Sequence, residues 1–96
     1  MASQIKRVSA DTNVTTSGTY VKSVVLTTDG TNAASVIIRD GDKASGTAVA
    51  SLRSPAAGPS AVWSAADRKG AYLADGLGVD VTGTGAECTV EFETAE

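Results

Sequence analysis

The sequence contains no histidine and a single cysteine, Cys88. Without histidine there is no histidine general base, no serine–histidine–aspartate triad and no histidine metal ligand. One cysteine cannot form a disulfide within the chain, and Cys88 alternates with Val90 and Phe92, so we expect a buried, unmodified thiol. No nucleophile–base pair or metal-ligating cluster is found among the remaining residues. We therefore expect no catalytic, cofactor-binding or metal-binding residues, no cofactor and no enzyme activity.

Aromatic side chains are also scarce, since the 96 residues include only one Trp, two Tyr and one Phe. The apolar fraction of 42% consists mostly of Ala and Val. At about 25 cal/mol per Å² of buried apolar surface, each Ala in place of a Leu gives up roughly 1–2 kcal/mol. A chain of this length therefore has a small core of its own, and we expect it to form a homo-oligomer whose interfaces add buried surface.

The charge and the apolar runs exclude two classes of partner. Eight basic and eleven acidic residues give a formal charge of −3, whereas nucleic-acid binding calls for a basic surface. No apolar run reaches the length of a membrane span, and the start MASQIKR lacks the apolar core of a signal peptide. We expect no nucleic-acid partner and no membrane partner.

What the sequence does contain is alternation with a period of two, clearest at residues 76–93. There the apolar residues alternate with Gly, Asp, Thr and Glu on both sides of the turn Gly83-Thr84-Gly85. A period of two places one set of side chains on each face of a strand, so we expect a half-buried antiparallel hairpin. Its outer face would carry Glu87, Glu91 and Glu93, which would deter edge-to-edge pairing or bind basic groups of a partner.

Similar patterns recur along the chain at intervals of roughly ten residues, separated by turn residues. They predict further strands at residues 20–28, 35–39, 47–53, 61–64 and 71–73. Residues 20–28 are apolar on both faces, as in a central strand, with Tyr20, Val24 and Leu26 on one of them. About seven to eight short strands indicate an all-β fold, an antiparallel β-sandwich or a jelly-roll-like barrel. The expected core residues are Leu26, Ile38, Leu52, Val79, Val81, Val90 and Phe92.

The chain divides by composition near residue 20. Residues 1–19 are polar and rich in Ser and Thr, and they are expected to form an N-terminal arm or an edge strand, with candidate strands at 4–8 and 13–16. Residues 20–96 are expected to form the β-sandwich domain. Ala65–Gly70 is expected to be a helical turn or a polar loop.

Three local patterns suggest sites, each with a simpler structural interpretation. Asp40 and Asp42 resemble the first ligands of a calcium loop, but the later ligands are absent, which favours a solvated turn. Gly83 and Gly85 begin a string like a nucleotide-binding motif, yet a strand follows them, which favours positive φ angles in a turn. The charged segment 67–70 is expected to be a solvated loop, with a contact to a neighbouring subunit as the alternative.

Several segments together resemble small β-sandwich virion structural proteins of tailed bacteriophages, of the capsid decoration (cement) or head-fibre type. The similar segments are VKSVVLTTDGTNAASVIIRDG, ASGTAVASLRSPAAG and AVWSAADRKGAYLADGLGVDVTGTGAECTVEFE, within residues 20–93. These segments are landmarks of a β-fold and contain no catalytic signature.

The resemblance implies a capsid decoration protein that stabilises the head as a homotrimer. It would be made in the host cytoplasm, would be located on the capsid surface of the virion, and would have the major capsid protein or another virion protein as its partner. Alternatives are a head-fibre, neck or tail component, or a carbohydrate-binding or adhesin module. Trp63, between Val62 and the end of its strand, is expected to belong to the core more than to a sugar-binding platform.

Overall fold

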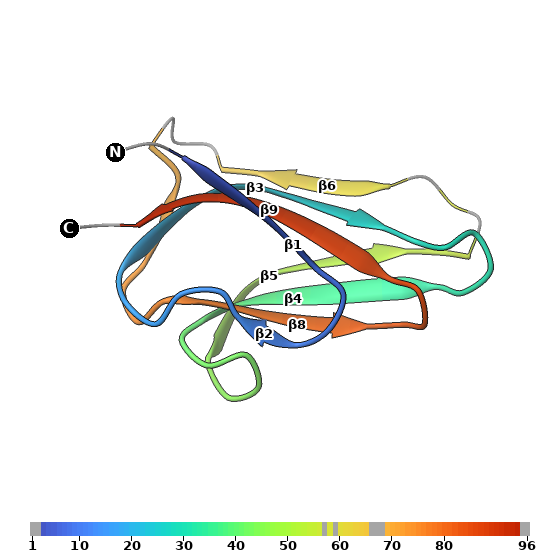
Figure 1. Ribbon diagram of the computed structural model, residues 1–96, viewed down its shortest axis with the longest axis horizontal. Coiled ribbons are helices and arrows are strands. Elements are labelled where there is room, and N and C mark those ends of the chain that lie inside the picture. Colours follow the sequence, from blue (N-terminus) through green and yellow to red (C-terminus); the bar gives the residue numbers. More distant parts are fainter. Residues whose placement is uncertain (1–2, 57, 59, 66–68, 95–96) are drawn as a thin grey trace.

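The chain folds as an antiparallel β-sandwich, as the alternation predicted (Figure 1). The computed structural model describes residues 3–56, 58, 60–65 and 69–94. The strands within that part are β1 (Gln4–Val8), β2 (Thr12–Asn13), β3 (Thr19–Thr27), β4 (Ala34–Asp40), β5 (Thr47–Ser54), β6 (Ala61–Ser64), β7 (Ala71–Leu73), β8 (Leu77–Thr82) and β9 (Glu87–Thr94). The described residues contain no helix, and therefore no helix with the length and apolar character to cross a membrane.

The two sheets lie one above the other in Figure 1. The first has the order β1-β9-β3-β6, with β7 also paired to β3, and the second has the order β2-β8-β4-β5. The inner faces of both sheets form the core, whose largest fully buried side chains include Leu26, Ile38 and Leu77. Five of the seven predicted core residues are buried, while Leu52 and Val81 are partly buried and pack against the core.

Strand β3 is central, as predicted, but one of its faces was assigned wrongly. Val21 pairs with Phe92 and Ser23 pairs with Glu91, so Lys22 is an extra residue that forms a β-bulge. A bulge shifts the alternation by one residue. Val21 therefore joins Val24 and Leu26 in the core in place of Tyr20, and Lys22 remains at the surface.

The predicted C-terminal hairpin is wrong, although both of its strands exist. β8 pairs with β2 and β4 in the second sheet, whereas β9 pairs with β1 and β3 in the first. The turn at Gly83–Gly85 thus carries the chain from one sheet to the other, at the right-hand end of Figure 1. An alternating pattern shows that a strand has one buried face. Two strands of one sheet and two strands that face each other across a core have the same pattern, so the pattern cannot tell these arrangements apart.

The N-terminal residues lie along one side of the sandwich. β1 pairs with β9 over five residues, and β2 pairs with β8 over two. Val8, at the end of β1, is 5% exposed and belongs to the core. Both sheets therefore include residues on the N-terminal side of position 19.

Gly83 should tolerate a side chain less well than Gly30, and the two form a matched pair. Both have positive φ, 121° at Gly83 and 88° at Gly30. A Cβ at Gly83 would contact the carbonyl oxygen of Ala33, whereas a Cβ at Gly30 would meet nothing within 4 Å. We expect Gly30→Ala to lower the free energy of unfolding by about 1 kcal/mol and Gly83→Ala by roughly 2 kcal/mol or more. Urea denaturation of both variants measures this, and equal losses would contradict the close approach of Gly83 to the backbone of Ala33 in the neighbouring strand's extension.

Candidate functional site

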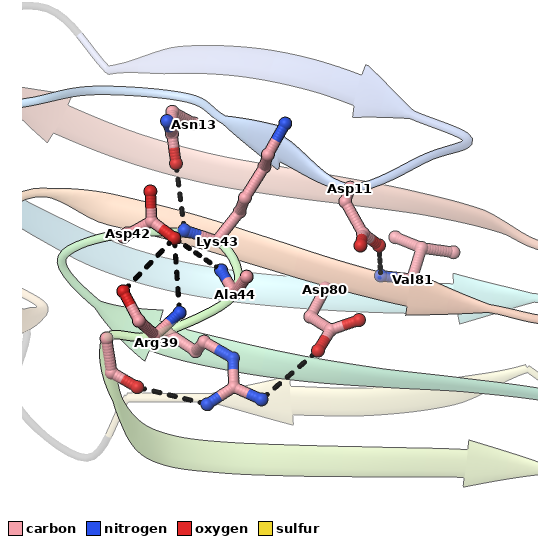
Figure 2. Close-up of polar contacts among 10 residues, drawn as sticks. Asp11, Asn13, Arg39, Asp42, Lys43, Ala44, Asp80 and Val81 are labelled. Carbon is pink, nitrogen blue, oxygen red and sulfur yellow. Dashed lines mark hydrogen bonds and ion pairs between the residues drawn. The ribbon is translucent and has the colours of Figure 1, made fainter.

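An ion pair holds the outer face of the second sheet together. Arg39 of β4 donates from Nη2 to Oδ2 of Asp80 on β8 at 3.1 Å, and from Nη1 to the carbonyl oxygen of Gly46 at 3.0 Å (Figure 2). The side chains are only 18% and 23% exposed, so water screens the pair weakly. Arg39 therefore fastens the loop that ends at Gly46 to the sheet, and its Nε is buried without a partner among the described residues.

The two carboxylates that resembled a calcium loop bind backbone amides. Oδ2 of Asp42 accepts from the amides of Ala44 at 2.8 Å and Ser45 at 3.1 Å, and these bonds lower the pKa of Asp42. Oδ1 of Asp40 accepts from the amide of Asp75 at 2.9 Å. In the described part of the chain no three acidic or cysteine side chains are grouped so that they could hold a metal ion. Asp42 therefore caps a turn, whereas Asp40 is the last residue of β4, so the expectation of a solvated turn is wrong for Asp40.

The N-terminal segment is held to the same region by side-chain oxygens (Figure 2). Oδ1 of Asn13 accepts from the amide of Lys43 at 2.8 Å, and Oδ1 of Asp11 accepts from the amide of Val81 at 2.9 Å. A hollow of about 190 Å³ lies beside these contacts, lined in part by Asn13, Asp42 and Asp75. The carboxylates in this region hold the loops in place, since each of these hydrogen bonds joins a side-chain oxygen to a backbone amide.

The glutamates of β9 do not protect a sheet edge, because β9 lies between β1 and β3. Glu87 pairs with Arg7 of β1 at 3.4 Å, and Glu93 pairs with Lys22 of β3 at 3.4 Å. Oε1 of Glu91 accepts from the hydroxyl of Ser23 at 3.4 Å. These carboxylates thus bind neighbouring strands of their own chain, and the expected edge-protecting role is wrong.

Residues 67 and 68 of the charged tip lie outside the described residues, as do 66–68 of the candidate turn at Ala65–Gly70. Lys69 is described, and its Nζ lies 5.0 Å from the centre of the Tyr20 ring. Tyr20 in turn contacts Tyr72, with 5.0 Å between the ring centres, and Tyr72 is 54% exposed. Trp63 is partly buried against the core, as expected.

A free strand edge and an apolar hollow lie at one side of the second sheet. Among the described strands β5 pairs only with β4, so the other side of Thr47–Arg53 forms a free edge. An open hollow of about 500 Å³ lies at the C-terminal end of this strand, lined by Ala33, Ser35, Arg53, Pro55 and Thr82 among others, and its surface is mostly apolar. Sequence reasoning missed both features, although the stretch Thr47–Ser54 carries only one charge, at Arg53, which is unusual for an exposed edge.

Comparison with known proteins identifies no relative, because no family model, no curated protein and no solved structure matches the chain.

Removal of Arg39 should destabilise the sandwich through two lost hydrogen bonds. We expect Arg39→Ala to lower the free energy of unfolding by about 1–3 kcal/mol, since both bonds involve a charged donor and are mostly shielded from water. Asp80→Asn keeps an acceptor for Arg39 and should cost less than Arg39→Ala. Urea denaturation measures the stability of both variants. An Arg39→Ala protein as stable as the wild type would contradict a stabilising role of the bonds from Arg39 to Asp80 and Gly46.

Cys88 should be unreactive in the native protein, because it is fully buried and burial raises its pKa to about 11. A thiol reagent should label it far more slowly than in denaturant. Above pH 9 the unfolded state loses the thiol proton first, so the free energy of unfolding should fall as the pH rises from about 9 to about 11. Cys88→Ala, measured in parallel, should lack this part of the pH dependence; identical profiles would contradict it.

Proposed function

We propose that this chain is a non-catalytic structural protein of a tailed-bacteriophage virion, a capsid decoration protein that works as a homotrimer on the head. The virion assignment rests on the resemblance of residues 20–93 to small β-sandwich virion proteins. The all-β sandwich is the fold that this resemblance implied. The proposal also follows the expectation of no enzyme activity, since the sequence lacks histidine.

The observation that carries the proposal is the contrast between the polar and the apolar features of the surface. Asp11, Asp40 and Asp42 bind backbone amides of their own chain. The open hollow of about 500 Å³, by contrast, is mostly apolar and lies beside a free strand edge. Apolar hollows and free edges are features that contact other proteins. A decoration protein acts through such contacts, because it adds buried interface between capsid subunits and so resists the internal pressure of the packaged DNA.

A carbohydrate-binding or adhesin module is the alternative from another class, and the exposed ring of Tyr72 is the feature that favours it. Sugar-binding platforms usually present flat aromatic faces. Here the neighbouring Tyr20 ring is tilted by 44° to Tyr72 and has Lys69 above it. The tilt and the lysine favour decoration over sugar binding.

The proposal is tested on purified particles of the phage whose genome encodes the chain. Antibody labelling followed by electron microscopy should place the chain on the head surface. Particles made without the gene should lose their DNA at a lower temperature, and supply of the wild-type gene in trans should restore the resistance. Labelling confined to the tail or neck would favour the runner-up, and absence of the chain from purified particles would overturn the virion assignment.

A further inference from the structure

β5 is the long, weakly charged edge among the described strands. β2 has two residues and β6 has four, so each offers little backbone for pairing. The five residues of β1 include Lys6 and Arg7, which discourage the approach of another strand. β5 has eight residues, a single charge at Arg53, and no proline. The backbone of Thr47–Arg53, which has a described strand on one side only, is therefore the best template for an added strand.

Two apolar features lie near opposite ends of this edge. Val49 is 49% exposed and stands at an irregularity in the pairing of β5 with β4. Arg53 and Pro55 line the open hollow of about 500 Å³ at the other end. An antiparallel partner with the same sequence would bring its own Val49 toward this hollow. The edge is thus self-complementary, since each copy offers an apolar side chain and a place that can receive one.

We propose that two copies of the chain pair through β5 in antiparallel fashion, about a two-fold axis at Ser51. This register places Val49 of each copy opposite Arg53 of the other, beside the hollow. Ala50 then lies opposite Leu52, so small and apolar side chains occupy the centre. The second sheets of the two copies form one continuous sheet across the axis, as in other isologous contacts.

The distance between the two Arg53 charges favours the register with the axis at Ser51 over the register with the axis at Leu52. With the axis at Ser51, the two Arg53 residues lie four positions apart, about 13 Å along the strands at roughly 3.3 Å per residue. With the axis at Leu52 they would lie two positions apart, about 7 Å, which is within the screening length of roughly 8 Å at physiological salt. The axis at Ser51 therefore avoids repulsion between like charges.

The pairing assigns to a second copy the free edge and the hollow that support protein contacts in the proposed function, and it does not require the virion assignment. A three-fold contact on a capsid would have to use a different surface of the chain. In solution, the two-fold contact requires assemblies with an even number of copies.

Cysteine substitutions on one strand test the register. Directly opposite residues of an antiparallel pair have Cα atoms about 4.5–5.5 Å apart, a distance that a disulfide spans. Ser51→Cys should therefore form a cross-linked dimer on mild oxidation, seen on a denaturing gel without reductant. Ala48→Cys is the matched control, because Ala48 is also exposed on β5 and its two copies would be about 20 Å apart. Equal cross-linking of the two variants, or none in Ser51→Cys, would overturn the pairing.

Charge substitutions test the same contact without a cross-link. Val49→Lys places a lysine opposite Arg53 of the other copy, so sedimentation should show half the wild-type mass at the same concentration. Arg53→Glu added to Val49→Lys should restore the mass, because the opposed charges then attract. Val62→Lys is the control, since Val62 is 61% exposed on edge strand β6 of the other sheet and its substitution should leave the mass unchanged.

The sedimentation mass of the wild-type protein tests the β5 pairing directly. A wild-type protein that sediments as a monomer or a trimer at about 100 µM would overturn the proposal. Dissociation by Val62→Lys, with Val49→Lys still assembled, would instead assign the interface to β6 and would also overturn it.

Discussion

The apolar layer between the two sheets is the contact on which the rest of the molecule depends. It is made largely of valine, with Leu26, Ile38 and Leu77 as its largest fully buried aliphatic side chains. Such small side chains fill the space between two sheets only if the sheets approach closely and nearly every strand contributes. The need for contributions from nearly every strand explains why Val8, close to the N-terminus, belongs to the core.

Side-chain alternation was enough to predict the fold class and most of the core, because burial of one face imposes a period of two on each strand separately. It could not assign strands to sheets. Val79 and Val90 look equivalent in the sequence, yet they approach the core from opposite sheets. Nor could it reveal the bulge at Lys22, which depends on how β3 pairs with β9. Strand pairing joins residues that are far apart in the sequence, and local patterns hold no information about it.

The surface was harder to predict than the core, for a related reason. Asp42 was correctly predicted to lie in a turn, since carboxylates often accept hydrogen bonds from the amides that follow them, whereas Asp40 ends β4 and accepts from the distant amide of Asp75. The contacts of Asn13 with Lys43 and of Asp11 with Val81 connect segments that are distant in the chain, so they had no local signal. The glutamates of β9 were expected to deter edge-to-edge pairing or to bind basic groups of a partner, but β9 lies inside its sheet. Whether a strand lies at an edge follows from topology, and so does the free side of β5.

The turn between β8 and β9 has a consequence for how the chain reaches its fold. The chain passes from one sheet to the other between β1 and β2, β2 and β3, β3 and β4, β5 and β6, β7 and β8, and β8 and β9. Among the described strands, the consecutive pair that forms a hairpin is β4 with β5. Few native pairings can therefore form early from neighbouring residues. Loops must close before β3 meets β9 or β4 meets β8, and topologies of this kind fold in milliseconds to seconds. Until both sheets are complete, newly made chains expose strand edges to one another, and the rate of closure determines how much of the protein is lost to aggregation.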